Sequence, residues 1–302
     1  MSADASSLKA VLFALAANFG IFVAKSAAAV LTGSSAMPAE AVHSFADCGN
    51  QLLLLRGMKE AQRAPDQNHP LGYGMVVYFW SFLVAVLLFS VGGLFSIYEG
   101  THKLHSTEPL AFPLAAIGVL SVSIVLEAVS LWGCLREIKK NAAGKNLWRY
   151  FRTSRDSELI VVMGEDIAAL AGLVIALGAV IITMMTGNPV FDAIGSIAVG
   201  VLLILVAALL SIQIKALITG QSADAGIEAR MRSCLQAQTE VTEIFSLLTL
   251  QMGTDVMVAV KARMRETHDA QRLIDDINRV ERVMRDAFPQ IRWLFFEPDD
   301  NA

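Results

Sequence analysis

The protein has 302 residues, of which 55% are hydrophobic and only 17% are charged, and its mean hydropathy is +0.54. So large an apolar excess excludes an ordinary soluble domain and indicates a membrane protein that crosses the bilayer several times. The net charge of −4 excludes the basic excess that is typical of proteins that bind nucleic acid.

Six stretches of the chain contain the roughly 20 largely apolar residues that a bilayer-spanning helix needs. In chain order they are residues 8–31, 37–58, 73–101, 110–138, 159–186 and 189–218. The third and fourth exceed the minimum length, so we expect them to tilt or to extend beyond the bilayer. The first lacks the charged segment and cleavage pattern of a signal peptide, and we interpret it as a membrane span.

Lysine and arginine are distributed unevenly over the connections between these spans. The connections after the second and fourth spans contain Arg56, Lys59, Arg63, Arg136, Lys139, Lys140, Lys145, Arg149, Arg152 and Arg155. The connections on the opposite side contain only Lys103. Because basic residues accumulate in cytoplasmic connections, we expect both chain termini to be cytoplasmic. No transit peptide is visible, which favours a bacterial inner membrane.

The composition changes after Gly220 to the charged pattern of a soluble domain. Residues 225–238 and 269–288 predict amphipathic helices, and residues 243–253, 255–265 and 291–298 predict strands. The order αββαβ predicts a small α+β domain. We therefore expect an all-α membrane domain of six transmembrane helices at residues 1–218 and a cytoplasmic α+β domain at residues 219–302.

Ionisable side chains occur within the apolar spans, where each costs at least a few kcal/mol and is a functional candidate. The second span contains His43 and Asp47, which are four residues apart and share one helical face, with Glu40 about one turn away. The fifth span contains Glu165 and Asp166. Adjacent residues cannot both face one point on a regular helix, so one of these two carboxylates is expected to bond a neighbouring helix.

An imidazole nitrogen and several carboxylate oxygens suit a divalent transition ion such as Zn²⁺. Because the set is rich in oxygen, Mn²⁺, Fe²⁺ and Co²⁺ remain open as alternatives. The residues alone leave a second interpretation, in which His43 and Asp47 form a structural hydrogen-bonded pair between helices. Glu127 in the fourth span is interpreted as an accessory carboxylate, used in helix packing or accessible to protons, rather than as a ligand.

A further pair of candidate ligands lies in the connection between the second and third spans. Asp66 and His69 are three residues apart in "PDQNHPLGYG" and could hold a metal ion weakly. Asp and His followed by Pro and Gly are also ordinary turn-forming residues. The sequence favours neither interpretation over the other.

Four stretches of the sequence resemble the cation diffusion facilitators, a family of six-span metal–proton antiporters. They are "KSAAAVLTGSSAMPAEAVHSFADCGNQ", "PDQNHPLGYG", "GEDIAALAG" and "FDAIGSIAVGVLL", and the second-span match is similar to the zinc transporter 9-like branch. The resemblance implies that the C-terminal domain has a ferredoxin-like or metallochaperone-like fold and that the protein is a homodimer.

The resemblance also implies a transport site for the metal ion. The family takes two ligands four residues apart from the second span, which map onto His43 and Asp47, and two from the fifth span. The later fifth-span position maps onto Asp166, but the earlier falls on Val162, which cannot bind metal. The fourth ligand is then either water or Glu165. The family's loop site maps onto Asp66 and His69, with Tyr73 in place of a further histidine.

The resemblance predicts Zn²⁺ efflux in exchange for protons by alternating access, with Mn²⁺, Fe²⁺ or Co²⁺ as alternative cargo. The metal is then a substrate, and no resident cofactor is expected. Two other classes remain as alternatives: a membrane-embedded metalloenzyme and a non-transporting metal sensor or scaffold. The first is disfavoured because the sequence offers no nucleophile near the His and Asp residues and no HExxH motif.

Overall fold

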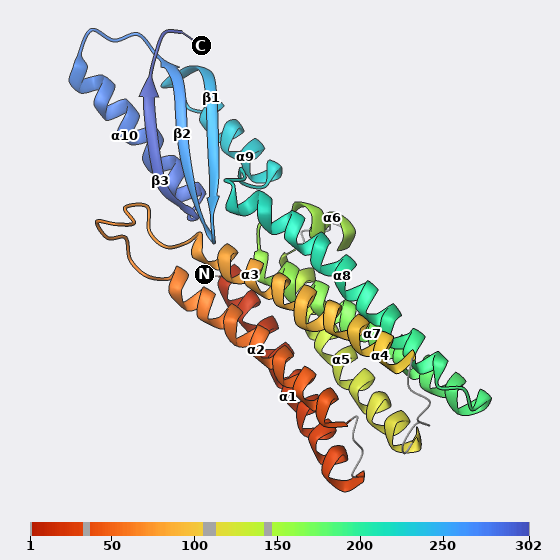
Figure 1. The fold of residues 1–302 in the computed structure, drawn as a ribbon. Helices are drawn as coiled ribbons and strands as arrows, with labels where there is room; N and C mark the ends of the chain where they lie inside the picture. The colour runs from red at the N-terminus through yellow and green to blue at the C-terminus, as the bar shows by residue number, and fades with distance from the viewer. Residues whose placement is uncertain (1, 33–36, 105–112, 142–146, 302) are drawn as a thin grey trace. The chain divides into compact units, whose positions relative to one another are not determined.

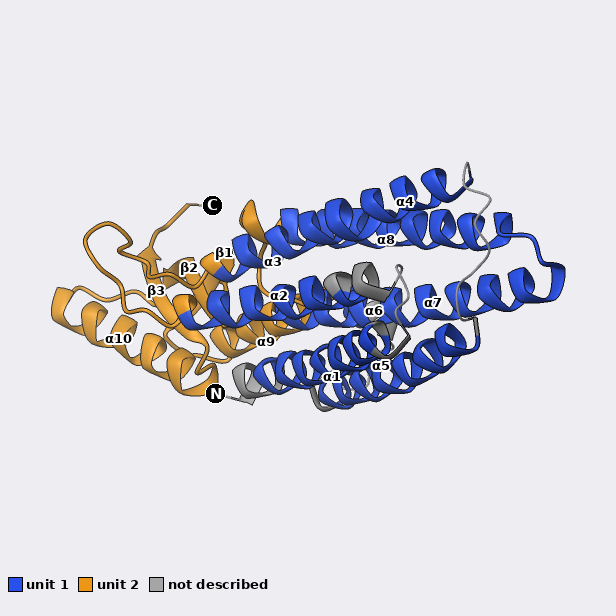
Figure 2. Ribbon diagram, turned by 60° about the horizontal axis from the view of Figure 1, so that its bottom comes forward, with its two compact units in different colours: residues 1–59, 77–152, 156–215 blue, residues 60–76, 153–155, 216–302 orange. Residues whose placement is uncertain are grey.

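The computed structural model describes residues 2–32, 37–104, 113–141 and 147–301 (Figure 1). The described part forms two compact units. Residues 1–59, 77–152 and 156–215 belong to the first unit, and residues 60–76, 153–155 and 216–302 to the second (Figure 2). The expected domain boundary at residue 218 stays a prediction, because the second unit also includes two connections between helices.

The first unit consists of long helices. Its elements are α1 (Ser2–Thr32), α2 (Met37–Ala61), α3 (Val76–Leu87), the π-helical segment η1 (Leu88–Leu94), α4 (Phe95–Leu104), α5 (Pro113–Asn141), α6 (Leu147–Thr153), α7 (Ser157–Thr186) and α8 (Val190–Ile218). The short helix α6 lies in a connection for which the sequence predicted no structure. The start of the expected fourth span, residues 110–112, lies outside the described residues.

Five helical stretches of the described chain are long and apolar enough to cross a membrane. They are Ser7–Ala28, Val76–Leu104, Leu114–Lys139, Ser157–Thr186 and Val190–Ile218. They correspond to five of the six expected spans, and the remaining one is α2. Because α2 carries polar and charged side chains, including Asp47, Asn50, Gln51 and Arg56, its apolar character is lower. The number six therefore stays a prediction.

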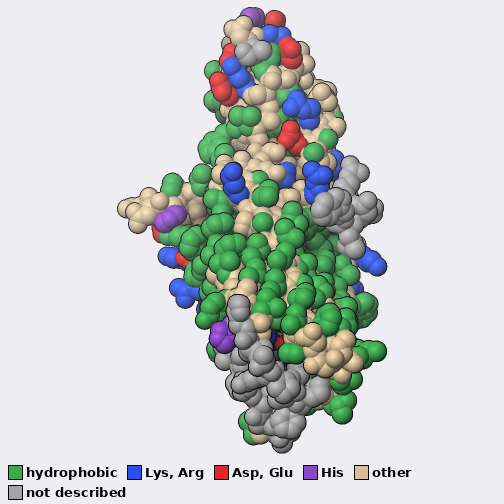
Figure 3. All heavy atoms as spheres, turned by 45° about the vertical axis from the view of Figure 1, so that its right-hand side comes forward, with side chains coloured by type: hydrophobic (Ala, Val, Ile, Leu, Met, Phe, Trp, Pro, Cys, Tyr) green, Lys and Arg blue, Asp and Glu red, His purple; other side chains and the backbone are tan. Residues whose placement is uncertain are grey.

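Large apolar side chains are exposed on the helices of the first unit. Phe19, Trp132, Met185 and Leu205 are each more than half exposed. Figure 3 shows a broad field of hydrophobic side chains on the face in view. Soluble proteins rarely expose so large an apolar surface, so a bilayer is the solvent that this unit requires.

Helix η1 packs closely against α8 through glycines. A Cβ atom on Gly93 would lie 2.5 Å from Ile204 Cγ1, and one on Gly200 would lie 2.7 Å from the Gly93 carbonyl oxygen. No other residue type fits at this contact. Helix α7 ends at Gly187, whose φ of 67° is the left-handed conformation that glycine adopts readily.

The second unit confirms the predicted αββαβ order. Its elements are α9 (Ala225–Gln236), β1 (Val241–Met252), β2 (Asp255–Met264), α10 (Ala270–Ala287) and β3 (Ile291–Pro298). The sheet order is β1-β2-β3, with β1 antiparallel and β3 parallel to β2. Alternate residues of β2 are buried, and both helices contribute to the same core: Met231 and Leu235 from α9, Val280 and Met284 from α10.

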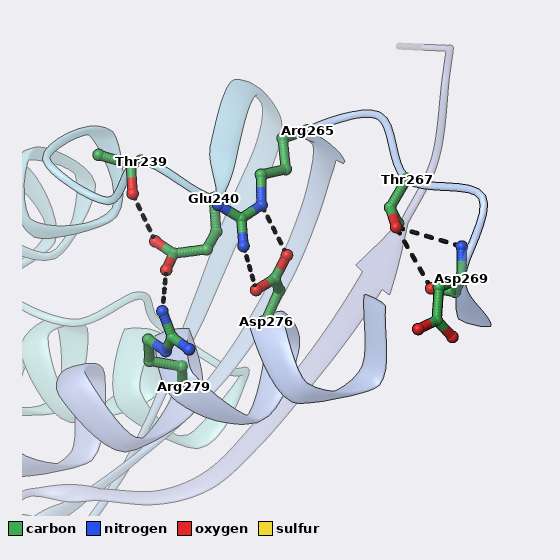
Figure 4. A network of polar contacts seen from close by, with 7 residues as sticks. All are labelled: Thr239, Glu240, Arg265, Thr267, Asp269, Asp276 and Arg279. Carbon is green, nitrogen blue, oxygen red and sulfur yellow. Dashed lines mark hydrogen bonds and ion pairs between the residues drawn. The ribbon is translucent and has the colours of Figure 1, made fainter. Parts of the chain in front are cut away.

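Buried acids in the second unit are paired with arginines (Figure 4). Two guanidinium nitrogens of Arg265, Nε and Nη2, donate to the Asp276 carboxylate, at 2.8 and 2.6 Å. Arg279 Nη1 donates to Glu240 Oε1 at 2.9 Å, and Thr239 donates to the other oxygen of Glu240. Asp276 and Glu240 are 2% and 4% exposed, so the two pairs fasten α10 to the sheet through buried carboxylates, while the Arg265 and Arg279 side chains are partly exposed.

The connection between α2 and α3 packs on the β1–β2 hairpin within the second unit. A Cβ atom on Gly253, at the hairpin turn, would lie 2.6 Å from the Gly74 carbonyl oxygen. The Trp293 indole N–H donates to the Leu71 carbonyl oxygen at 3.3 Å. These contacts explain why residues 60–76 belong to the same compact unit as the sheet.

Candidate metal site

Glu165 of α7 is held by two amide side chains of α2. Asn50 Nδ2 donates to Glu165 Oε1 and Gln51 Nε2 donates to Oε2, each at 2.7 Å. All three side chains are buried. The expectation that one of the two adjacent acids of the fifth span bonds a neighbouring helix therefore describes Glu165, which joins α7 to α2.

Asp166 takes a different direction from Glu165. Its Oδ2 accepts a hydrogen bond of 3.0 Å from Ser130 Oγ of α5. Asp166 is 2% exposed, and its described partner is an uncharged hydroxyl group. One oxygen of this carboxylate is thus oriented by α5, and the other has no hydrogen-bond donor among the described side chains.

A cavity of about 150 Å³ connects these acids inside the first unit. It follows α7 from Glu165 to Ala179, a distance of about 20 Å at the rise of an α-helix. The charged residues on its wall are Lys25, Asp47, Glu99, Glu127, Glu165, Asp166 and Asp192. Asp47 of α2 and Asp166 of α7, two of the expected ligands, therefore face the same cavity.

The other expected residues of the second span are only partly described. Glu40 and His43 lie in α2, but their side chains are outside the described part of the structure. Among the side chains that are described, no group of three or more His, Cys, Asp or Glu is placed to hold one metal ion. Val162, at the position where the resemblance implied a ligand, is fully buried in α7.

The loop candidates Asp66 and His69 are arranged as a turn. Asp66 Oδ1 accepts hydrogen bonds from the backbone N–H groups of Asn68 and His69, and the Tyr73 hydroxyl donates to Oδ2 at 2.6 Å. The hydroxyl bond, followed by the backbone bonds, lowers the pKa of Asp66 below its ordinary value. His69 Nδ1 lies 3.6 Å from Asp66 Oδ1, and its ring packs on Tyr73. These contacts are turn chemistry, and metal binding at the loop stays a prediction.

Several residues around the cavity received no role from the sequence. Asn50 and Gln51 are neutral hydrogen-bond donors to Glu165, and Ser130 is one to Asp166. Their only signal in the sequence is that they are polar residues within apolar spans. Lys103 bridges Glu99 of α4 and Asp192 of α8, at 3.1 Å to each. The sequence shows that Glu99 and Lys103 are four residues apart and can pair on one helix, but it does not show that Asp192 of α8 is the second partner of Lys103.

Comparison with known proteins decides the family. Residues 11–214, about two thirds of the chain, match the cation efflux transmembrane domain. The chain belongs to the cation efflux family.

Named relatives agree with this assignment. The chain is 36% identical to the mitochondrial proton-coupled zinc antiporter SLC30A9 of Xenopus laevis, over 81% of this chain and 44% of the relative. It is 36% identical to metal tolerance protein C4 of Arabidopsis thaliana, over 83% of this chain and 55% of the relative. It is 25% identical to the zinc transporter ZitB of Pectobacterium atrosepticum, over 90% and 80%.

The chain spans about half of the length of the first two relatives. The family is one of cation transporters and not of enzymes. The predicted family and its zinc transporter 9-like branch are thereby confirmed. The alternative of a membrane-embedded metalloenzyme is not supported by these relatives.

Proposed function

We propose that this protein moves a divalent transition-metal ion, Zn²⁺ in the first place, out across a membrane in exchange for protons. The observation that carries the proposal is the cavity in the first unit, which is lined by Asp47, Glu165 and Asp166 between helices otherwise suited to lipid. Carboxylates at such a depth require a compensating cation. Two relatives, a zinc antiporter and a zinc transporter, support Zn²⁺ as that cation.

In this proposal the ligands are His43, Asp47 and Asp166. Each oxygen of Glu165 already accepts a short amide hydrogen bond, so we assign Glu165 to holding α2 against α7 and assign the fourth ligand position to water. The test is the Zn²⁺ affinity of Glu165→Gln. A loss of affinity as large as that of Asp47→Ala would return Glu165 to the set of ligands.

Metal and protons exclude one another at such a site. A ligating imidazole must be neutral and a ligating carboxylate must be ionised, so metal binding releases protons and protonation releases metal. Alternating access then exposes the same residues first to one side of the membrane and then to the other. A pH difference across the membrane drives the exchange, because the unperturbed pKa of His is close to physiological pH.

The orientation and assembly belong to the proposal as well. The basic connections support cytoplasmic termini, and the resemblance supports a homodimer through the second unit. The relatives at 36% identity are a mitochondrial protein and a plant protein, so they lend no support to a bacterial inner membrane. What the five apolar helices establish is an integral membrane protein.

The deciding experiment is transport by the purified full chain in liposomes with an imposed pH difference. His43→Ala and Asp47→Ala should abolish Zn²⁺ uptake, and Phe45→Ala, which changes an exposed residue of the same helix, should not. Full uptake by both site variants would refute the site. A wild-type chain that binds Zn²⁺ but moves neither metal nor protons would instead be a sensor. Competition among Zn²⁺, Mn²⁺, Fe²⁺ and Co²⁺ in the same assay identifies the cargo.

A further inference from the structure

Glu127 is the buried acid of the cavity that the proposed metal site does not use. It lies on α5 at the middle of the apolar stretch Leu114–Lys139 and is 4% exposed. Its side chain lines the cavity. It is at least 39 residues away in sequence from every proposed ligand on α2 and α7, and no hydrogen bond joins it to Asp47 or Asp166 among the described residues, although the charges of both acids act on it across the cavity.

Glu127 differs from the other buried acids in having no fixed partner. Glu165 accepts two amide hydrogen bonds and Asp166 accepts one from a hydroxyl group. No hydrogen bond or ion pair reaches Glu127 within the described part of the chain. A buried ionised carboxylate without donors is costly, whereas its protonated form carries no charge. The side chain therefore gains by binding a proton when the cavity holds no other cation.

The charged groups that surround Glu127 come from each helix that contributes to the cavity. The groups that line the cavity with it and act on its charge are Lys25 from α1, Asp47 from α2, and Glu165 and Asp166 from α7. His43 is also on α2. Further along, Glu99 and Asp192 are engaged with Lys103. Around Glu127 the acids outnumber the lysine. Their net negative charge disfavours ionisation of Glu127 until a cation binds in the cavity.

We propose that Glu127 is a proton-binding residue of the transport cycle, protonated in the metal-free cavity and deprotonated when a divalent cation enters. The O–H bond of its carboxyl group breaks, the proton passes to water in the cavity, and the carboxylate stays beside the metal charge. No redox partner is needed. The inference rests on the proposed function, because it assigns part of the proton exchange to a residue that does not bind the metal.

The coupling follows from electrostatics at a distance. A divalent cation bound by Asp47 and Asp166 would bring two positive charges into the low-dielectric cavity that Glu127 also lines, and these charges favour the ionised form of the Glu127 carboxyl group. By reciprocity, an ionised Glu127 favours binding of the metal. A neutral isostere at this position should consequently behave like the protonated state. It should bind metal, but without giving up this proton.

The first test counts protons released when Zn²⁺ binds to the full chain in detergent and a weak buffer. Glu127→Gln should release about one proton fewer per bound ion than the wild type, and for each pH unit its Zn²⁺ affinity should change by a factor of about ten less than that of the wild type. Glu127→Asp, which keeps the carboxyl group, should restore the release. Glu99→Gln is the matched control, since this acid lines the same cavity but is paired, and it should release the wild-type number.

A second measurement requires no variant. In infrared difference spectra of the wild type, Zn²⁺ binding should remove the band of a protonated buried carboxyl group. Wild-type proton release by a folded Glu127→Gln chain, or the persistence of that band, would overturn the inference. A wild-type chain that binds no Zn²⁺ would instead refute the proposed function, so the two failures are distinguishable.

Discussion

The two units of this protein bury acids in opposite ways. In the second unit, Asp276 and Glu240 are each neutralised by an arginine that the fold supplies (Figure 4). In the first unit, Glu165 and Asp166 are held by amides and a hydroxyl group, and Glu127 is held by neither. Burial is the same, between 2% and 4% exposed, but the source of the compensating charge differs.

In the proposed function, that difference separates acids that stabilise the fold from acids that bind metal or protons. Removing a carboxylate from water costs several kcal/mol, and a paired cation must recover that cost. In the second unit the cation is covalently part of the chain, so the charge is fixed. In the first unit neutral donors orient Glu165 and Asp166 without neutralising them, and in the proposed function the compensating cation is mobile: a metal ion or a proton.

The largest expected effect is that of Asp166→Asn. The amide keeps an acceptor for Ser130 but loses the charge that the metal requires, so we expect Zn²⁺ uptake to fall by at least about a hundredfold, more than the loss of a neighbouring partner causes. Uptake in liposomes and calorimetric Zn²⁺ affinity measure it. Near-wild-type uptake would mean that Asp166, like Asp276 and Glu240, stabilises the fold and does not bind the metal.

The mirror experiment is Asp276→Asn in the second unit. It weakens a charged hydrogen-bonded pair at a buried position, and we expect it to destabilise that unit by about 1–3 kcal/mol while leaving Zn²⁺ uptake unchanged. Hydrogen exchange of peptides from α10 and β2 gives the free energy. The comparison would fail if exchange stayed at the wild-type rate, or if uptake fell together with stability.

A smaller effect is expected for Ser130→Ala. Loss of the hydroxyl group frees Asp166 from α5, so the Zn²⁺ concentration for half-maximal uptake should rise about tenfold. Ser123→Ala is the control, because Ser123 is a buried serine of the same helix whose Oγ has no hydrogen-bond partner among the described residues. Equal effects of both variants would indicate a packing role instead.

The smallest effect concerns the exposed loop of the second unit. Hydrogen bonds, above all from Tyr73, lower the folded-state pKa of Asp66 below its ordinary 3.8. The contribution of Asp66 to loop stability is therefore complete above the ordinary value and is lost only as pH falls through the lowered one. Tyr73→Phe removes the largest cause, so the loop should loosen at a higher pH. Hydrogen exchange of residues 66–72 across an acid series would show this, and an unchanged midpoint would contradict it.

Much of the fold could be predicted because its signals are local. The apolar runs indicated six membrane helices, five of which are long and apolar enough in the described chain, and alternation along β2 with the period of α10 indicated the αββαβ unit. Partners distant in the chain left no such signal: Asn50 and Glu165 are 115 residues apart, and neither amide predicts which acid it meets. The same limit hid the contact of Lys103 with Asp192. Candidate acids could thus be selected from sequence, but their division into oriented and unpartnered acids required the structure.

The π-helical segment η1 also determines which side chains reach the cavity. A π-helical turn contains one residue more than an α-helical turn, so if residues 88–94 formed a regular α-helix with no residue removed, everything after them would be rotated by about 100°. Glu99 would leave the cavity wall and Lys103 would lose Asp192, although every residue of α4 would be retained. In this part of the protein, the direction in which the side chains of α4 face depends on the π-helical segment before it as much as on the residues of α4 themselves.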